Sequence, residues 1–218
     1  MTSAFNTLIR VLDVTAEPGG GGRNFSMMPG EAVWIREERE AGRKWLDWVT
    51  GIEPPPTGAV EWKDVDWRYR SADEAAAQRG RIGCVFAGRG LLANLDMDEN
   101  VWLPAQMHRR DQAADDIEKW ARLFGCWPLP QERAPTVAED RRRRILWTRA
   151  FAGRPEALVL EWPLVDTGAD DRDLLLRAVD QIRNAGCAIV WLDQQLSDEV
   201  RSALEPLVWA APLPRQGA

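Results

Sequence analysis

Charged residues fill one short connection between a predicted strand and a predicted helix. The apolar run 32–35 predicts a buried strand, and the amphipathic segment 44–50 predicts a helix. A strand, a loop and a helix in this order can bring backbone N–H groups together on a phosphate if the loop residues are small. Here the loop contains Glu37, Glu38 and Glu40. A carboxylate about 4 Å from a phosphate charge costs on the order of 4 kcal/mol at an effective dielectric near 20. A solvated charged turn is therefore favoured over a phosphate site.

Two further predicted strand ends carry side chains that bear on hydrolysis. The buried run "ALVLEWP" ends in Glu161 and Trp162, and "AIVWLD" is followed by Gln194. The Glu161 carboxylate is interpreted as a hydrogen-bonded group at the strand end in preference to a cation ligand. An indole cannot accept a proton from water and an amide does not titrate. General-base chemistry is therefore missing at Trp162 and Gln194.

The composition argues against a nucleic-acid partner. The chain has 218 residues, of which 45% are hydrophobic and 28% charged, with a formal net charge of -6. A net negative chain has no bulk attraction to nucleic acid or to an anionic membrane. The run 141–144 is four arginines, but Glu139 and Asp140 precede it, which predicts a solvated helix face. The only histidine, His108, is expected at the surface.

The N-terminus and the cysteines indicate a compartment. No signal peptide and no apolar run of membrane-spanning length is recognised, so a cytoplasmic location is expected. Three widely spaced cysteines are interpreted as buried, reduced thiols.

Alternating strands and helices predict an α/β fold with a mostly parallel sheet. A small antiparallel β part is expected at the N-terminus, where "EPGGGGR" is a turn between strands. We expect a single domain over 1–218, with a core formed by 1–86 and 151–218 and an inserted helical subdomain at 87–150. The segments that indicate this are strands at 7–14, 32–35, 82–86, 156–163 and 187–193, an edge strand at 59–67 ("AVEWKDVDW"), and helices at 71–80 and 170–186. Ser71 is predicted to be the N-cap of the helix at 71–80.

Taken in order, these segments resemble the ATPase subunit of an ATP-binding cassette (ABC) transporter over about residues 8–200. The similar stretches are "PGEAVWI", "VTGIEPPPTGAVEWKDVDW", "IGCVFAGRGLLANLDMDENVWLP", "RILWTRAFAGRPEALVLEWP" and "AIVWLDQQL". The third stretch is most similar to the branch that serves lipid-trafficking (MCE/Mla-type) transporters. The resemblance implies a P-loop NTPase-like nucleotide-binding domain.

The resemblance also identifies which residues occupy the family's chemical positions. Without gaps, Arg36 and Ala41 replace the two glycines of the phosphate loop, Gly42 the lysine and Arg43 the magnesium-binding hydroxyl. A one-residue shift puts Arg43 on the lysine and Lys44 on the hydroxyl. The other positions depart as well: Ala87 replaces the glutamine, Glu161 the magnesium-binding aspartate, Trp162 the catalytic glutamate and Gln194 the switch histidine, and residues 137–141 replace the signature.

These departures predict a degenerate, non-hydrolysing cassette for which no cofactor is expected, although weak binding of ATP and Mg²⁺ stays open. As a subunit it would contact an integral-membrane permease and pair with itself or with an active ABC ATPase. It would then lie in the cytoplasm at the inner membrane and reach the membrane only through the permease. The expected contact surface is the loop residues Gly88, Arg89, Leu91, Leu92, Asn94 and Leu95. Internal packing of this loop is the competing interpretation.

Two alternatives remain open at this point. One is a divergent but active ATPase, in which Arg43 or Lys44 replaces the lysine and Glu161 the aspartate. The other is a soluble scaffold or regulator that works without a permease.

Overall fold

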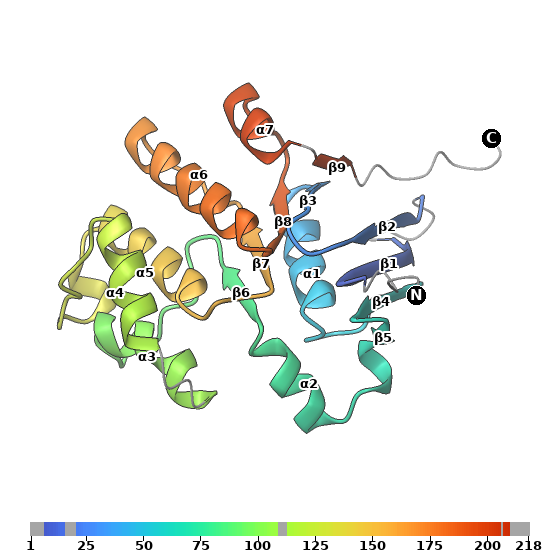
Figure 1. Ribbon diagram of the computed structural model, residues 1–218, viewed down its shortest axis with the longest axis horizontal. Coiled ribbons are helices and arrows are strands. Elements are labelled where there is room, and N and C mark those ends of the chain that lie inside the picture. Colours follow the sequence, from blue (N-terminus) through green and yellow to red (C-terminus); the bar gives the residue numbers. More distant parts are fainter. Residues whose placement is uncertain (1–6, 16–20, 109–112, 206, 210–218) are drawn as a thin grey trace.

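A computed structural model describes residues 7–15, 21–108, 113–205 and 207–209 (Figure 1). Its centre is a five-stranded parallel sheet with the strand order β6-β7-β8-β3-β9. The five strands are β3 (Ala32–Arg36), β6 (Ile82–Val85), β7 (Ala157–Glu161), β8 (Ala188–Asp193) and β9 (Leu207–Trp209). The predicted strands coincide with four of these, because near-continuous apolar runs are typical of a sheet covered on both faces.

A second, four-stranded antiparallel sheet has the order β2-β1-β4-β5. Its strands are β1 (Ile9–Val14), β2 (Arg23–Met27), β4 (Ala59–Trp62) and β5 (Val65–Asp66). The segment "AVEWKDVDW" was expected to be one edge strand, but it forms the β4–β5 hairpin. Lys63 and Asp64 both have positive φ there, as a two-residue hairpin turn requires. Gly58 cannot carry a side chain, because a Cβ would lie 2.1 Å from the carbonyl oxygen of Leu12.

Helix α1 (Arg39–Val49) lies between the two sheets and joins them into one apolar cluster. Its buried residues, which include Trp45, Leu46 and Trp48, contact the antiparallel sheet on one side. On the other side they meet the face of the parallel sheet that carries Val33 and Ile35. This helix was expected only over 44–50, and it begins five residues earlier than that, at Arg39.

The opposite face of the parallel sheet is covered by helices from three parts of the chain. They are α3 (Met97–Met107), α4 (Ala113–Leu123), α5 (Glu139–Phe151), α6 (Ala169–Asn184) and α7 (Asp198–Leu204). Trp120, Phe124, Trp147 and Phe151 pack ring against ring between α4 and α5. Their cluster is continuous with the sheet residues Trp34 and Leu160, so the predicted helical stretch shares the core of the sheet.

Two local predictions can be compared directly with the structure. Ser71 caps α2 (Ala72–Arg79) in a capping box with Glu74, as the sequence indicated. The arginines at 141–144 are not a uniformly solvated face, because Arg143 and Arg144 pair with Asp171 of α6. The sequence analysis did not predict α7, β9 or the short 3₁₀ helices η1 (Trp67–Tyr69) and η2 (Ala134–Thr136).

The tryptophans and cysteines are mainly internal. Most of the tryptophans whose side chains are described are buried, which confirms the packing interpretation. Cys126 and Cys187 are buried and Cys84 is half-buried, and all three are free thiols. Burial raises the pKa of Cys84 to about 12 and also raises the pKa of Cys187. Within the described residues, no helix is long and apolar enough to cross a membrane.

Candidate nucleotide site

Four parallel strands end at one edge of the sheet, and the residues that follow them form the candidate site. Arg36 at the end of β3 is level with Asp193 at the end of β8, and Glu161 at the end of β7 is level with Leu192. The loop after β6 begins beside Leu160 of β7. Because parallel strands run the same way, the sequence-predicted positions Arg36, Glu161 and Gln194 share this edge.

The connection between β3 and α1 is too short to form a phosphate loop. Only Glu37 and Glu38 separate the strand from the helix. The residues expected to form the turn are the first turn of α1, in which the Gly42 N–H donates to the Glu38 carbonyl at 2.8 Å. That N–H is therefore committed to the helix and cannot converge on a phosphate. The side chains of Glu38 and Glu40 are exposed, as predicted for a solvated charged segment.

Glu37 departs from that prediction, because it turns into the protein. Its carboxylate accepts a hydrogen bond from Nη2 of the buried Arg23 and one from the Trp45 indole N–H at 3.2 Å. Arg23 also donates to the Arg36 carbonyl at 2.9 Å, and its guanidinium lies 5.7 Å from the Trp45 ring centroid. Glu37 is thus part of an internal ion pair that fixes the end of β3 to β2.

Trp162 covers the position at which the phosphate loop would begin its helix. A Cβ placed on Gly42 would lie 2.2 Å from Cη2 and 2.3 Å from Cζ3 of the Trp162 indole. The ring therefore lies directly against the Gly42 backbone, and Trp162 is only 9% exposed. Its φ is +42°, and its N–H donates to the Leu192 carbonyl at 2.9 Å. Trp162, which replaces the catalytic glutamate in the resemblance, therefore also occupies space next to α1.

Glu161 is fully buried and pairs with cationic side chains of the same chain. Its carboxylate accepts hydrogen bonds from the Ala87 N–H at 3.1 Å and from Nη2 of Arg89, which lies 3.0 Å from one oxygen and 2.9 Å from the other. The exposed Arg43 approaches to 3.9 Å through Nε. Arg89 is 37% exposed and also lies over the Phe86 ring at 5.1 Å. Asp47 of α1 also interacts with the charges of Arg89 and Glu161. Burial and Glu53 raise the pKa of Asp47, and Arg89 opposes this rise.

A nucleotide with its metal ion does not fit this arrangement. A triphosphate needs convergent N–H groups, whereas the Gly42 N–H is used within α1 and its outer face is covered by the Trp162 ring. A divalent cation needs several oxygen ligands. The Glu161 carboxylate instead has the Arg89 guanidinium as its partner. The described residues contain no group of three or more histidine, cysteine, aspartate or glutamate side chains placed to hold a metal ion.

The remaining predicted chemical positions are mostly exposed. Lys44 and Gln194 are exposed, and Asp193 before Gln194 has a pKa raised by burial. In the signature segment Val137 is buried, whereas Glu139 and Asp140 form the exposed first turn of α5. His108 is exposed, as predicted, and lies against Gly80.

The predicted contact loop is ordered by one buried amide. The Asn100 side chain in α3 accepts a hydrogen bond from the Leu92 N–H at 2.7 Å. Its amide group donates to the carbonyls of Leu92, Leu95 and Asp96 at 3.1, 3.3 and 3.0 Å. Leu92 is 46% exposed, Gly88 and Asn94 are exposed, and Leu91 and Leu95 are half-buried. Arg89 differs from its neighbours because its guanidinium faces Glu161.

Three functional contacts were missed by the sequence reasoning. Arg23 has no sequence signal, because its partner Glu37 lies across two strands. Arg89 was assigned only to the contact surface, although its place two residues after Ala87 puts it beside the strand that ends in Glu161. Asn100 lies in the "ENV" segment that the resemblance had noted, and that segment was the available signal.

The comparisons first define the class of fold. The fold is that of an ABC ATPase domain. A dimeric post-hydrolysis structure of the ATP-binding cassette MJ0796 bound to ADP and Pi matches with a TM-score of 0.79 at 15% identity. A second dimeric structure of MJ0796, a bacterial ABC transporter cassette, matches with a TM-score of 0.80 at 16% identity. Both matches cover 93% of this chain and 94% of the other.

Sequence relatives then indicate the family. The chain is 26% identical over 193 residues to the lipoprotein-releasing system ATP-binding protein LolD 1 of Rhodopirellula baltica, covering 84% of this chain and 83% of that protein. It is 26% identical over 140 residues to the methionine import ATP-binding protein MetN 1 of Bacillus cereus, covering 62% of this chain and 40% of that protein. No protein-family model matches the chain. In fold and in sequence, this chain is therefore similar to ATP-binding subunits of ABC transporters.

Proposed function

We propose that this chain is a non-hydrolysing cassette subunit that contributes shape and contacts to a transporter without turning over ATP. One observation supports the proposal: residues at the positions that the resemblance assigns to phosphate and metal binding are in contact with other side chains of the chain. Trp162 covers Gly42, and Arg89 neutralises the buried Glu161 carboxylate. Binding ATP and Mg²⁺ would require both contacts to break and α1 to lose its first turn. Trp162 would still offer no base for water.

The proposed partner is an integral-membrane permease, with the chain on the cytoplasmic side of the inner membrane. The relatives named for lipoprotein release and methionine import support a transport role. The family branch that the loop resembles supports a lipid substrate. The cassette would pair with itself or with an active ABC ATPase, and the dimeric MJ0796 structures support such a pairing. The proposed permease surface is the exposed part of the loop that Asn100 holds, centred on Leu92 and Asn94.

A nucleotide titration tests the first part of the proposal. The full chain is titrated with a fluorescent ATP analogue in the presence of Mg²⁺, beside an ATP-binding relative such as the R. baltica protein. We expect no saturable binding in the micromolar range and no phosphate release. Lys44→Ala serves as the diagnostic variant, because the divergent ATPase alternative uses Arg43 or Lys44 in place of the lysine. Micromolar affinity that weakens in Lys44→Ala would support the divergent ATPase and overturn the proposal.

Co-purification tests the second part. A tagged chain is co-expressed with a candidate permease, and Leu92→Glu is compared with Tyr69→Glu. Both side chains are exposed, but Tyr69 lies on η1, away from the loop. We expect Leu92→Glu to abolish co-purification and Tyr69→Glu to leave it unchanged. Equal retention of the permease by both variants would remove this loop as the contact surface.

A further inference from the structure

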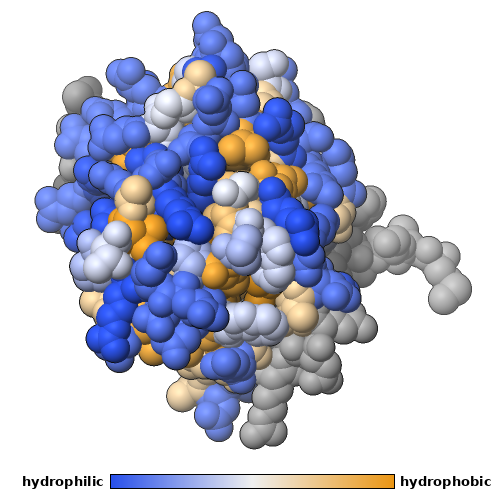
Figure 2. Space-filling view, turned by 90° about the vertical axis from the view of Figure 1, so that its left-hand side faces the viewer, coloured by the Kyte–Doolittle hydropathy of each residue, from blue (hydrophilic) through white to orange (hydrophobic). Residues whose placement is uncertain are grey.

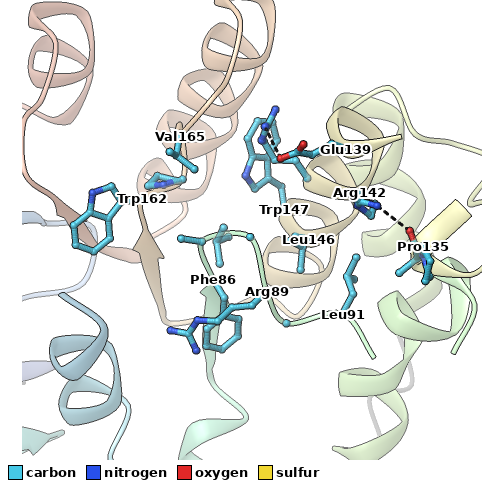
Figure 3. A pocket seen from close by; sticks show the side chains of 17 residues that line it. Phe86, Arg89, Leu91, Pro135, Glu139, Arg142, Leu146, Trp147, Trp162 and Val165 are labelled. Atoms are coloured by element: carbon cyan, nitrogen blue, oxygen red, sulfur yellow. Dashed lines mark hydrogen bonds and ion pairs between the residues drawn. The ribbon is translucent and has the colours of Figure 1, made fainter. Parts of the chain in front are cut away.

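A cavity of about 310 Å³ lies next to the candidate nucleotide site and shares Ala87, Arg89 and Trp162 with it. Its floor is the loop 85–91 after β6, one wall is α5, and the other is the turn 162–165 after β7 (Figure 3). No described residue between Arg36 and Lys44 lines it. The Trp162 ring points away from the other lining side chains in Figure 3, so the indole that covers Gly42 does not fill this space.

The wall formed by α5 presents a single stripe of the helix to the cavity. Relative to Glu139, the residues Arg142, Arg143, Leu146 and Trp147 follow at i+3, i+4, i+7 and i+8, which places them on one face. Leu146 and Trp147 give this stripe an apolar part, and Leu91 from the loop adds to it. A cavity of this size with mainly apolar walls and a few polar groups has the make-up of a small-molecule site.

The lining also leaves one cation without a carboxylate partner. Arg89 is neutralised by Glu161, and Arg143 by Asp171 and more distantly by Glu139. Arg142 donates to the Ala134 carbonyl at 3.2 Å and forms no ion pair with any carboxylate in the described part of the chain. A guanidinium has five N–H donors, so most of those on Arg142 remain available.

A second donor in the lining is unsatisfied. The Trp147 indole N–H has no hydrogen-bond partner among the described residues, and Trp147 is fully buried. Trp147 lines the cavity, although its nitrogen itself exposes less than 1 Å². Buried donors are normally paired, so the N–H would gain its missing partner if an acceptor in the cavity drew the ring toward it.

We propose that this cavity binds a small organic anion with an apolar body. The anionic group, a carboxylate or a comparable oxyanion, pairs with Arg142, and the body packs against Leu91 and Leu146. An acceptor on the ligand satisfies the Trp147 N–H. A triphosphate does not suit the cavity, because it carries several negative charges and only one lining cation is uncompensated. The proposal does not depend on whether the chain hydrolyses ATP.

Octanoate and 1-octanol are suitable probes, because they differ mainly in the charged group. The ¹⁵N-labelled full chain is titrated with each, and the indole N–H signal of Trp147 is followed after assignment with Trp147→Phe. We expect a saturable shift with octanoate and a dissociation constant on the order of 1 mM for a ligand of this size. Octanol should bind about tenfold more weakly, because it cannot form the charge-assisted pair.

Three variants test the location. Arg142→Ala should weaken octanoate binding about tenfold, and Arg142→Lys should weaken it less. Arg141→Ala removes an exposed arginine from the same helix and should leave the affinity unchanged. Val165→Trp narrows the cavity and should abolish the Trp147 shift. The proposal is overturned by a Trp147 signal that does not move, by octanol binding as tightly as octanoate, or by equal losses in Arg141→Ala and Arg142→Ala.

Discussion

Removing the Arg89 guanidinium is the most direct test of how the chain treats its buried carboxylate. In Arg89→Met the Glu161 carboxylate keeps the Ala87 N–H and the distant Arg43, but loses the nitrogen that contacts both of its oxygens. Breaking one side of a buried ion pair costs about 3–5 kcal/mol. Because Arg89 is partly exposed, solvent screening reduces the loss, and we expect about 2–3 kcal/mol of destabilisation.

The measurement is urea unfolding followed by tryptophan fluorescence. With a urea slope of about 2–3 kcal/mol per molar for a domain of this size, the midpoint should fall by about 1 M. Arg81→Met is the matched control: Arg81 forms an exposed pair with Glu156, and its loss should cost less than about 1 kcal/mol.

A double variant separates the ion pair from simple packing. Arg89→Met combined with Glu161→Met removes both charges, and it should recover most of the lost stability because an apolar pair of similar size is often neutral. Additive losses in the double variant would contradict the reasoning, since each side chain would then act on its own. A midpoint of Arg89→Met within about 0.2 M of the wild-type value would do the same.

Three further predictions concern other parts of the fold. Asn100→Ala should lower the free energy of unfolding in urea by about 2–4 kcal/mol, because it removes the side chain that hydrogen-bonds four backbone groups of the loop. It should also increase hydrogen exchange at the Leu92 N–H. A loss below about 1 kcal/mol would refute this. Burial alone would raise the pKa of Glu156, but hydrogen bonds from Lys63 and Arg81 outweigh burial and lower this pKa. The ionised Glu156 therefore stabilises the folded chain above its ordinary pKa of 4.5, and this stabilisation is lost as the pH falls through the lowered pKa. Glu156→Gln should therefore unfold with a shallower pH dependence below 4.5, and an unchanged profile would count against the pairing. Cys84 has a pKa of about 12, so little of it is thiolate at about pH 8. It should react with iodoacetamide roughly a thousandfold more slowly in the folded chain than in the urea-unfolded chain. Comparable rates would show that the fold does not hold Cys84 as a thiol.

Much of the fold could be predicted from local sequence, because the decisive signals were local. Continuous apolar runs predicted the central strands, and Ser71 predicted the start of α2. The early start of α1 was missed because the charged residues after Glu38 were compared with a loop, although most of them are compatible with a helix. The split of one expected strand into β4 and β5 depends on two residues with positive φ, for which Lys63 gives little warning.

The candidate site was predicted in position but not in its contacts. Shared strand ends placed Arg36, Glu161 and Gln194 at one edge, because parallel strands align their carboxyl ends. The pairs formed by Arg89 with Glu161 and by Arg23 with Glu37 join residues far apart in sequence. No periodicity encodes such pairs. Only the packing of the folded chain brings them together.

The pairs explain why the chemical departures belong together. Trp162 needs the absence of a side chain at Gly42, since any Cβ there would meet the indole at 2.2 Å. Glu161 needs a cation at Arg89 as long as no metal ion neutralises it. Changing Trp162 alone to glutamate would add a carboxylate next to Glu161, whose guanidinium partner is already in use. It would also leave a void against α1, and both effects destabilise the chain. A single reversion toward an active site therefore carries a cost in folding, and this coupling favours a cassette that persists as a structural subunit.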